Sequence, residues 1–281
     1  MKTNVAFSFI FLFLSILHAQ ENKISWQRSA PVQELDLFLF HSMQSVNLPT
    51  TETLQKNDLE FEISHRFIPT IRTGSKELWG FDGPVNIRFA LAYGITNKTV
   101  VALGRSNLDD NYDLTFKQKV FQFRNDILPT VIGIRAGAAW NTDIPNRKAS
   151  HNRNFQYYAQ LIINSMYNKK FAVGLVPSYL YNAHVTCPDI QYSFTMGTYA
   201  QYYLNDLLSI LVEWNATITG WRQYHNPVSF GIELETGGHF FKVVMTNSAE
   251  LNSSQFLSGA DLPFNDGNWR IGFNITRLLK L

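Results

Sequence analysis

The stretch SFGIELETGGHFFKVVMTNS, residues 229–248, contains the pattern that decides the fold, because apolar and polar side chains alternate along it. Successive side chains of a β-strand point to opposite faces. Phe230 and Ile232 would therefore share one face, while Glu233 and Glu235 share the other. Either the apolar face packs in a protein core or it contacts lipid.

The middle of this stretch predicts a tight turn, because Gly237 and Gly238 can adopt positive φ. A turn centred there pairs Glu233 with Lys242 across the hairpin. Opposite charges at facing positions contribute about 0.2–1 kcal/mol, and a slip of one residue would move Lys242 to the apolar face. The hydrophobic pattern and the ion pair therefore predict the same register, with Lys242 inside, within reach of Glu233 or Glu213.

The first residues have the features of an exported protein. Lys2 precedes an apolar run, residues 5–17, and the small Ala19 follows near a plausible cleavage point, so residues 1–19 are expected to be a secretory signal peptide. The single cysteine, Cys187, excludes an intrachain disulfide. No later stretch offers about 18 consecutive apolar residues, which argues against a transmembrane helix.

The remaining chain divides into a polar segment, residues 20–57, and a long alternating region, residues 58–281. We expect the first to be a periplasmic or plug segment and the second to be one β-barrel domain, because barrels of this length commonly form single domains. About twelve stretches of the second region suit a tilted strand that crosses a bilayer in about 9–11 residues. They are 58–67, 84–94, 97–106, 111–122, 129–141, 155–167, 170–182, 190–204, 207–220, 227–235, 238–247 and 268–278.

The connections between these stretches alternate in length, as in bacterial barrels with short periplasmic turns and longer outer loops. Short links are expected at residues 95–96, 168–169, 205–206 and 236–238, and mostly longer ones between them. The pattern predicts an all-β fold: a single antiparallel transmembrane β-barrel, an up-and-down meander with an even strand number and both termini periplasmic. The 14% aromatic content fits girdles at the two membrane interfaces.

The charged side chains of these strands occupy alternate positions, so they share one face. A Lys or Arg on the lipid face near mid-bilayer costs about 2–4 kcal/mol, whereas a charge inside a barrel finds a partner or water. We therefore place the charges in the lumen, as the one candidate site. Its members are Glu60, Glu62, Arg66, Arg88, Lys117, Lys119, Arg135, Glu213, Glu233, Glu235 and Lys242.

Five blocks of sequence resemble a known family: LEFEISHRF (59–67), GFDGPVNIRFALAYGIT (80–96), GRS (104–106), NPVSFGIELETGGHFFKVVMTNS (226–248) and IGFNITR (271–277). They are similar to an uncharacterised family of outer-membrane β-barrel proteins from Bacteroidota. The resemblance implies the fold and a location in the outer membrane of a Gram-negative cell. It implies no activity and no catalytic residues.

Two short motifs could bind metal. Asp109, Asn111 and Asp113 have the alternate spacing of a calcium loop but lack its glycine, so a solvated loop is favoured. His184 and Cys187 could ligate a soft metal, but one cysteine in one loop is weak evidence. We expect no metal and no cofactor.

An enzyme and a nucleic-acid-binding protein are both disfavoured. His65 resembles the histidine of membrane-embedded phospholipase barrels, but no serine and acid or amide partner can be placed beside it. The net charge is only +2 and no basic run is present, so composition does not support nucleic-acid binding.

Two functions fit the lumen charges. A barrel of about twelve strands has a lumen of intermediate width, between small barrels that side chains fill and wide porins with an aqueous channel. A passive pore or transporter for small polar solutes, favoured by a small margin, would use the charges as a selectivity lining. A closed, charge-filled barrel would instead be a structural or partner-binding subunit. A soluble secreted lipocalin-like binding barrel is the third alternative. Expected partners are outer-membrane lipid, the barrel-assembly machinery during insertion and an unidentified protein partner.

Overall fold

The computed structural model describes residues 36–280. The predicted signal peptide, residues 1–19, and the first part of the segment 20–57 lie outside the described residues. Leu37–Leu281 form one compact unit, separate from the residues before it. All that follows concerns this unit.

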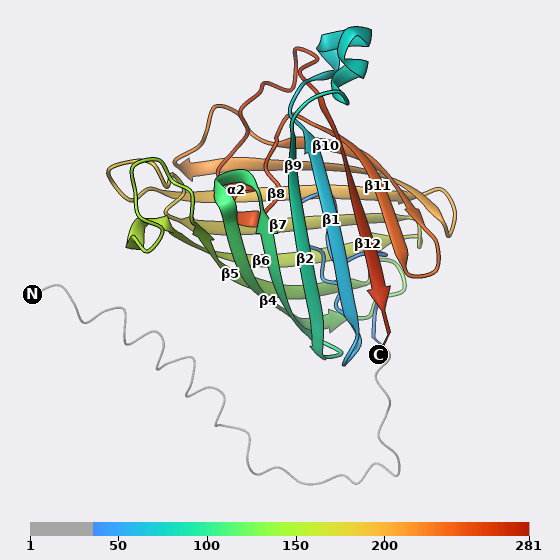
Figure 1. The fold of residues 1–281 in the computed structure, drawn as a ribbon. Coiled ribbons are helices and arrows are strands. Elements are labelled where there is room, and N and C mark those ends of the chain that lie inside the picture. Colours follow the sequence, from blue (N-terminus) through green and yellow to red (C-terminus); the bar gives the residue numbers. More distant parts are fainter. Residues whose placement is uncertain (1–35, 281) are drawn as a thin grey trace, which may run out of the picture. The chain divides into compact units, whose positions relative to one another are not determined.

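Twelve strands form a closed barrel in which every strand pairs antiparallel with its neighbours in the chain and β1 pairs with β12 (Figure 1). Each observed strand begins and ends within two residues of its predicted bounds. The fold is therefore the predicted up-and-down meander. The strands are β1 (Leu59–Phe67), β2 (Val85–Thr96), β3 (Thr99–Ser106), β4 (Asn111–Phe123), β5 (Thr130–Asn141), β6 (Phe155–Tyr167), β7 (Phe171–Tyr181), β8 (Tyr192–Tyr203), β9 (Leu208–Gly220), β10 (Val228–Glu235), β11 (His239–Thr246) and β12 (Arg270–Leu279).

The hairpin of β10 and β11 has the predicted register. Glu233 is the direct partner of Lys242. The amide of Thr236 donates to the carbonyl of His239 at 2.9 Å, and the two glycines between them adopt φ of 62° and 101°. Positive φ is readily available to glycine, so Gly237 and Gly238 set the turn and the turn sets the register.

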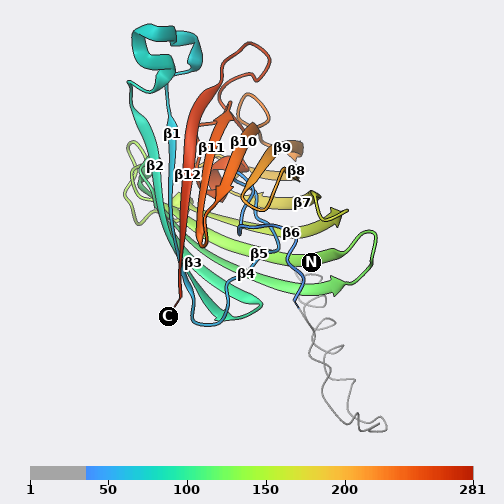
Figure 2. The same ribbon diagram turned by 90° about the vertical axis from the view of Figure 1, so that its right-hand side faces the viewer.

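Short links lie at one end of the barrel and longer connections at the other (Figures 1 and 2). The C-terminal end of β12 lies beside the short turns, since the amide of Leu278 donates to the carbonyl of Gly238 at 2.8 Å. The longer connections carry the helical pieces η1 (Ile71–Gly80), η2 (Leu108–Asp110), η3 (Asn152–Asn154) and α2 (Ser253–Phe256). Between residues 36 and 280, no helix is long and apolar enough to span a membrane.

The two faces of the wall have opposite chemistry. On β11, Phe241, Val243 and Met245 are exposed while Lys242 and Val244 are buried, and the other strands alternate in the same way. Apolar side chains therefore cover the outside and polar side chains line the inside. A soluble lipocalin-like barrel would have the reverse arrangement, so that alternative is excluded.

Residues 37–57 run inside the ring of strands, where the blue chain is visible in Figure 2. The segment reaches β1 at the end with the short turns, where the amide of Asn57 donates to the carbonyl of Gly94 at 2.8 Å. Most of its residues from Leu39 to Leu54 are buried. We call residues 37–57 the plug.

Candidate functional site

The structure places all eleven predicted site residues on the inner face of the wall. Nine of them are buried, whereas Arg135 and Glu235 are partly exposed. Their inward direction follows from strand parity, because the residues before and after each of them carry the outward, lipid-facing positions. Their partners fall into two groups: other wall residues, and the plug.

Two sets of wall charges form ion pairs within the wall. The Lys242 Nζ lies 3.1 Å from Oε2 of Glu233, as predicted from the hairpin. Arg88 binds Asp113 through both its Nε and Nη2 and lies 3.5 Å from Glu62. These charges neutralise one another within the wall, and the first pair also binds the plug: Nζ of Lys242 donates to the carbonyls of Gln44 and Ser45, and the hydroxyl of Ser42 donates to Glu233.

Other wall charges bind the backbone of the plug. The plug folds into a hairpin, residues 43–50, closed by hydrogen bonds between Met43 and Thr50 and between Ser45 and Leu48. At its base, Lys117 of β4 donates to the carbonyls of Met43 and Thr50 at 3.0 and 3.3 Å. The base of the hairpin is thus fixed to one side of the wall.

The tip of the plug hairpin is fixed to a different strand. The amides of Val46, Asn47 and Leu48 donate to the carboxylate of Glu213 on β9, at 2.8–3.1 Å. Three converging amides can replace the hydration of a carboxylate without a cation. No Lys, Arg or His nitrogen of the described chain lies within ion-pair distance of Glu213.

Side chains of the plug contribute two further contacts. The carboxylate of Glu52 lies 3.9 Å from Nζ of Lys119 on β4. On the other side, Nδ1 of His41 lies 3.5 Å from Glu233 and 3.4 Å from Glu235, both on β10. Glu52 of the plug therefore faces β4, and His41 of the plug faces β10.

Apolar contacts complete the seal. Leu39, Phe40 and Leu48 of the plug share one buried cluster with Tyr199 of β8 and with Phe256. Phe256 belongs to α2, in the connection between β11 and β12 that folds into the barrel, where Ser253–Phe256 are all buried. The lumen is thus occupied by the plug and by this inward connection.

A glycine on the wall makes room for one of these contacts. A Cβ at Gly174 of β7 would lie 2.1 Å from Cζ of Tyr199, so the tyrosine ring lies over the glycine backbone. In this position its hydroxyl donates to the carbonyl of Pro49 at 2.8 Å and accepts from Asn164 at 2.7 Å. The glycine thereby sets the position of a ring that holds the plug.

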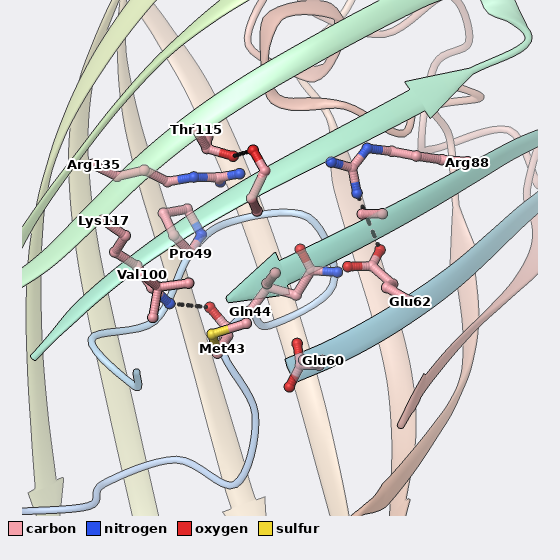
Figure 3. A pocket seen from close by; sticks show the side chains of 13 residues that line it. Met43, Gln44, Pro49, Glu60, Glu62, Arg88, Val100, Thr115, Lys117 and Arg135 are labelled. Carbon is pink, nitrogen blue, oxygen red and sulfur yellow. Dashed lines mark hydrogen bonds and ion pairs between the residues drawn. The ribbon is translucent and has the colours of Figure 1, made fainter. Parts of the chain in front are cut away.

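A small cavity of about 60 Å³ remains between the plug and strands β1–β5. Figure 3 shows Glu60 and Glu62 of β1 on one side of it, Lys117 and Arg135 on another, and the plug residue Gln44 between them. A buried water occupies about 10–15 Å³ on this measure, so the cavity has room for about four waters. Neither Glu60 nor Arg135 has an ion-pair partner among the described residues; the guanidinium of Arg135 lies over the ring of Tyr158 at 5.7 Å.

The inward connection contains a carboxyl group in an unusual environment. Burial raises the pKa of Glu250 to about 7, although the hydroxyl of Ser248 donates to its carboxylate. Nearby, Asn252 caps α2 by accepting from the amide of Gln255 and donates to Asn111 of β4. Glu250 is therefore a group of this loop that titrates near neutral pH.

Some functional residues were missed from sequence. Asp113 was assigned to a solvated loop, but it is buried in β4 and holds Arg88. Its spacing of four residues from Lys117 places it on the same face of a strand, and that signal was available. The plug contacts of His41 and Glu52 had no periodic signal to reveal them.

The other sequence motifs lie apart from the lumen site. The ring of His65 stacks on Phe273 with centroids 4.4 Å apart, and its register partners are Phe273 and Ile87, neither of which can act as a nucleophile. The ring of His184 stacks on Trp221 at 4.3 Å. Within residues 36–280, no three His, Cys, Asp or Glu side chains are grouped to hold a metal ion.

A closed antiparallel barrel with an apolar outside and a polar inside is the architecture of an integral outer-membrane protein, because closure leaves no unpaired strand edge in lipid. The outer membrane is therefore where this chain resides. Residues 40–279 match the family described as membrane bound beta barrel domain (DUF5777). The chain belongs to this family. No curated protein matches it.

Solved structures of outer-membrane proteins are similar to this chain over most of its length. A NanC porin has 10% identity and a TM-score of 0.48, with 79% of this chain and 100% of the porin covered. The COG4313 outer membrane channel from Pseudomonas putida F1 has 12% identity and a TM-score of 0.45, covering 82% and 98%. Outer membrane phospholipase A from Escherichia coli has 12% identity and a TM-score of 0.41, covering 79% and 90%. The similarity is one of fold.

Proposed function

We propose that this outer-membrane barrel is a plugged pore for small polar solutes, and that it opens when the plug leaves the lumen. The observation that supports this most directly is the way the plug is held. Lys117 and Glu213 bind backbone carbonyls and amides of the plug hairpin, and water can replace such partners. Release of the plug would expose a polar, charged lumen.

The wall itself does not need the plug in order to close. All twelve strand pairs, including β1 with β12, are formed by wall residues alone. A barrel of this strand number is wider than the eight-stranded barrels that side chains fill. Departure of the plug therefore leaves a continuous wall around an aqueous space beside the inward connection.

A reversible lock tests the gate. The side chain of Leu48 points at Gly197 of β8, where a Cβ would lie 2.7 Å from its Cδ1, so cysteines at these positions are within reach of a disulfide. The variant Leu48→Cys/Gly197→Cys, with Cys187→Ser to remove the native thiol, would be studied in planar bilayers. Under reducing conditions we expect discrete conductance steps, because the apolar seal lacks Leu48. When the disulfide is formed we expect no conductance.

Two matched proteins complete the experiment. Leu48→Cys with Cys187→Ser should conduct with or without reductant, and Cys187→Ser alone, which keeps Leu48 in the seal, should conduct less than the reduced variants. Silence of every reduced variant in folded protein contradicts the pore. Equal conductance of the locked and reduced forms contradicts the plug as the gate.

A closed barrel that serves as a structural or partner-binding subunit is the second candidate. The observation in its favour is the buried cluster that joins Phe256 of the inward connection to Leu39, Phe40 and Leu48 of the plug, because it blocks the lumen with two segments. Electrical silence of the reduced variants would support it.

Four further features belong to the same proposal. We propose that both ends of the chain face the periplasm, supported by the short turns beside the end of β12 and beside the entry of the plug. A non-enzymatic role is supported by the apolar register partners of His65. Insertion by the barrel-assembly machinery follows for any barrel of this class, and the Bacteroidota resemblance suggests the source.

A further inference from the structure

The charges of the wall are divided between two halves of the barrel. Strands β2–β5 carry four inward cations and one acid. Strands β9–β11 together with β1 carry five inward acids and two cations. Arg270 of β12 belongs to neither group, because it is bound to Asp261 of the adjoining loop. The first half contains Arg88, Asp113, Lys117, Lys119 and Arg135, and the second contains Glu213, Glu233, Glu235, Lys242, Glu60, Glu62 and Arg66.

These two halves face each other. In the closed ring of twelve strands, β4 and β10 are six positions apart, and Figure 2 shows them on opposite sides of the barrel. The plug hairpin, residues 43–50, links the two halves, since it reaches Lys117 of β4 with its base and Glu213 of β9 with its tip. An electric field therefore runs across the lumen, from the cationic side to the acidic side.

The plug has the polarity that this field favours. Its carbonyl oxygens, from Met43 and Thr50, and its carboxylate, from Glu52, face the cations of β4. Its converging amides face Glu213 and the imidazole of His41 faces Glu233, while the carbonyls of Gln44 and Ser45 bind Lys242, the cation that is paired with Glu233 on this side. The plug thus occupies the lumen as an internal dipolar ligand.

We infer that the open lumen selects small zwitterionic solutes, which lie across it with the anionic group toward Lys117, Lys119 and Arg135 and the cationic group toward Glu213. The inference rests on the proposed pore and specifies its substrate class. A fixed transverse field lowers the energy of a dipole that aligns with it, whereas a neutral solute of the same size gains little. A net anion or cation is attracted by one half and repelled by the other.

Liposome swelling with two solutes of similar size tests the selectivity. The probes are γ-aminobutyrate, a zwitterion, and 4-hydroxybutyramide, which is uncharged; both have zero net charge, so no membrane potential builds up. In liposomes carrying reduced Leu48→Cys/Gly197→Cys/Cys187→Ser protein, we expect the zwitterion to enter several-fold faster. Equal rates for the two solutes would overturn the inference while leaving the pore intact.

The charged halves are then tested in the same background. Lys117→Gln/Arg135→Gln and, separately, Glu213→Gln should each reduce the preference for the zwitterion while 4-hydroxybutyramide still enters. Lys98→Gln, in the exposed turn between β2 and β3, should leave the preference unchanged. No swelling with either solute in the protein with its wall charges intact contradicts the pore itself and, with it, the inference.

Discussion

At the scale of single residues, the lumen charges differ in what neutralises them. Lys242 and Glu233 are both almost fully buried and neutralise each other within one hairpin. Lys117 and Glu213 depend on backbone groups of the plug. Lys242 also donates to the carbonyls of Gln44 and Ser45, so both kinds of charge contact the plug, but only the first has an ion-pair partner within the wall.

Replacement of Lys242 by Met should destabilise the barrel strongly. It leaves the carboxylate of Glu233 buried without its cation, and breaking a buried pair in this way costs about 3–5 kcal/mol. Urea unfolding in detergent micelles would measure the loss. Lys98→Met, a matched change in an exposed turn, should have almost no effect, and an equal stability of the two variants would show that the Lys242 pair contributes nothing.

At the scale of elements, strand β7 and the plug are coupled through one aromatic ring. Gly174 leaves space for Tyr199, and Tyr199 in turn binds the carbonyl of Pro49. Through this contact, the residue at position 174 of β7 influences the position of the plug. A change on the wall can therefore loosen a segment more than a hundred residues earlier in the chain.

The change Gly174→Ala should displace this ring and loosen the plug. Overpacking of this kind costs about 1–3 kcal/mol, and the lost hydroxyl contact should speed hydrogen exchange of residues 43–50. Leu175→Ala, at the neighbouring lipid-facing position, should leave that exchange unchanged. Unaltered exchange in Gly174→Ala would mean that Tyr199 does not hold the plug.

The connection between β11 and β12 should respond to pH through Glu250. Its pKa is raised from 4.5 to about 7 by burial, so the folded state binds more protons than the unfolded state between these values. The contribution of Glu250 to the free energy of unfolding is therefore fully present below about pH 4.5 and is lost as the pH rises through about 7. The loss is roughly 3 kcal/mol at most. Hydrogen exchange of residues 250–258, corrected for its intrinsic rate, should speed up between about pH 5 and pH 8.

The variant Glu250→Gln is the matched control for this pH effect. It keeps the size of the side chain but cannot ionise, so its exchange should be slow and nearly independent of pH after correction. A pH response in the variant as large as in the native protein would assign the titration to another group.

At the scale of the whole molecule, the wall and the plug are separable. Closure of the ring depends on strand pairing, and the apolar outside matches the hydrocarbon of the membrane. The plug adds contacts inside but no strand to the wall. The barrel should therefore persist when the plug is out.

A gel-shift experiment checks this independence. Unboiled protein should migrate differently from boiled protein, and the reduced Leu48→Cys/Gly197→Cys/Cys187→Ser variant should show the same shift as the locked form. Loss of the shift on reduction would mean that the plug supports the barrel, and that opening by plug release would unfold the wall.

The sequence by itself determined the strands, their faces and the register of the last hairpins. The stretch 155–167 was predicted and observed with the same bounds, and Glu233 pairs with Lys242 as expected. The reason is local: a period of two places every side chain inside or outside once the strand is known. The same rule places Asp113 on the inner face with Lys117, because the predicted stretch 111–122 contains both, but the calcium-loop spacing led to its assignment to a solvated loop.

Only the tertiary structure decided what fills the lumen and how its charges oppose each other. The plug binds mainly through backbone amides and carbonyls, which every sequence carries, so residues 37–57 show no pattern that reveals their place. The opposition of β4 and β10 arises from closure of the ring, because strands far apart in sequence meet across the lumen only when β1 pairs with β12. Local alternation fixes the direction of each charge, and closure fixes which charges it faces.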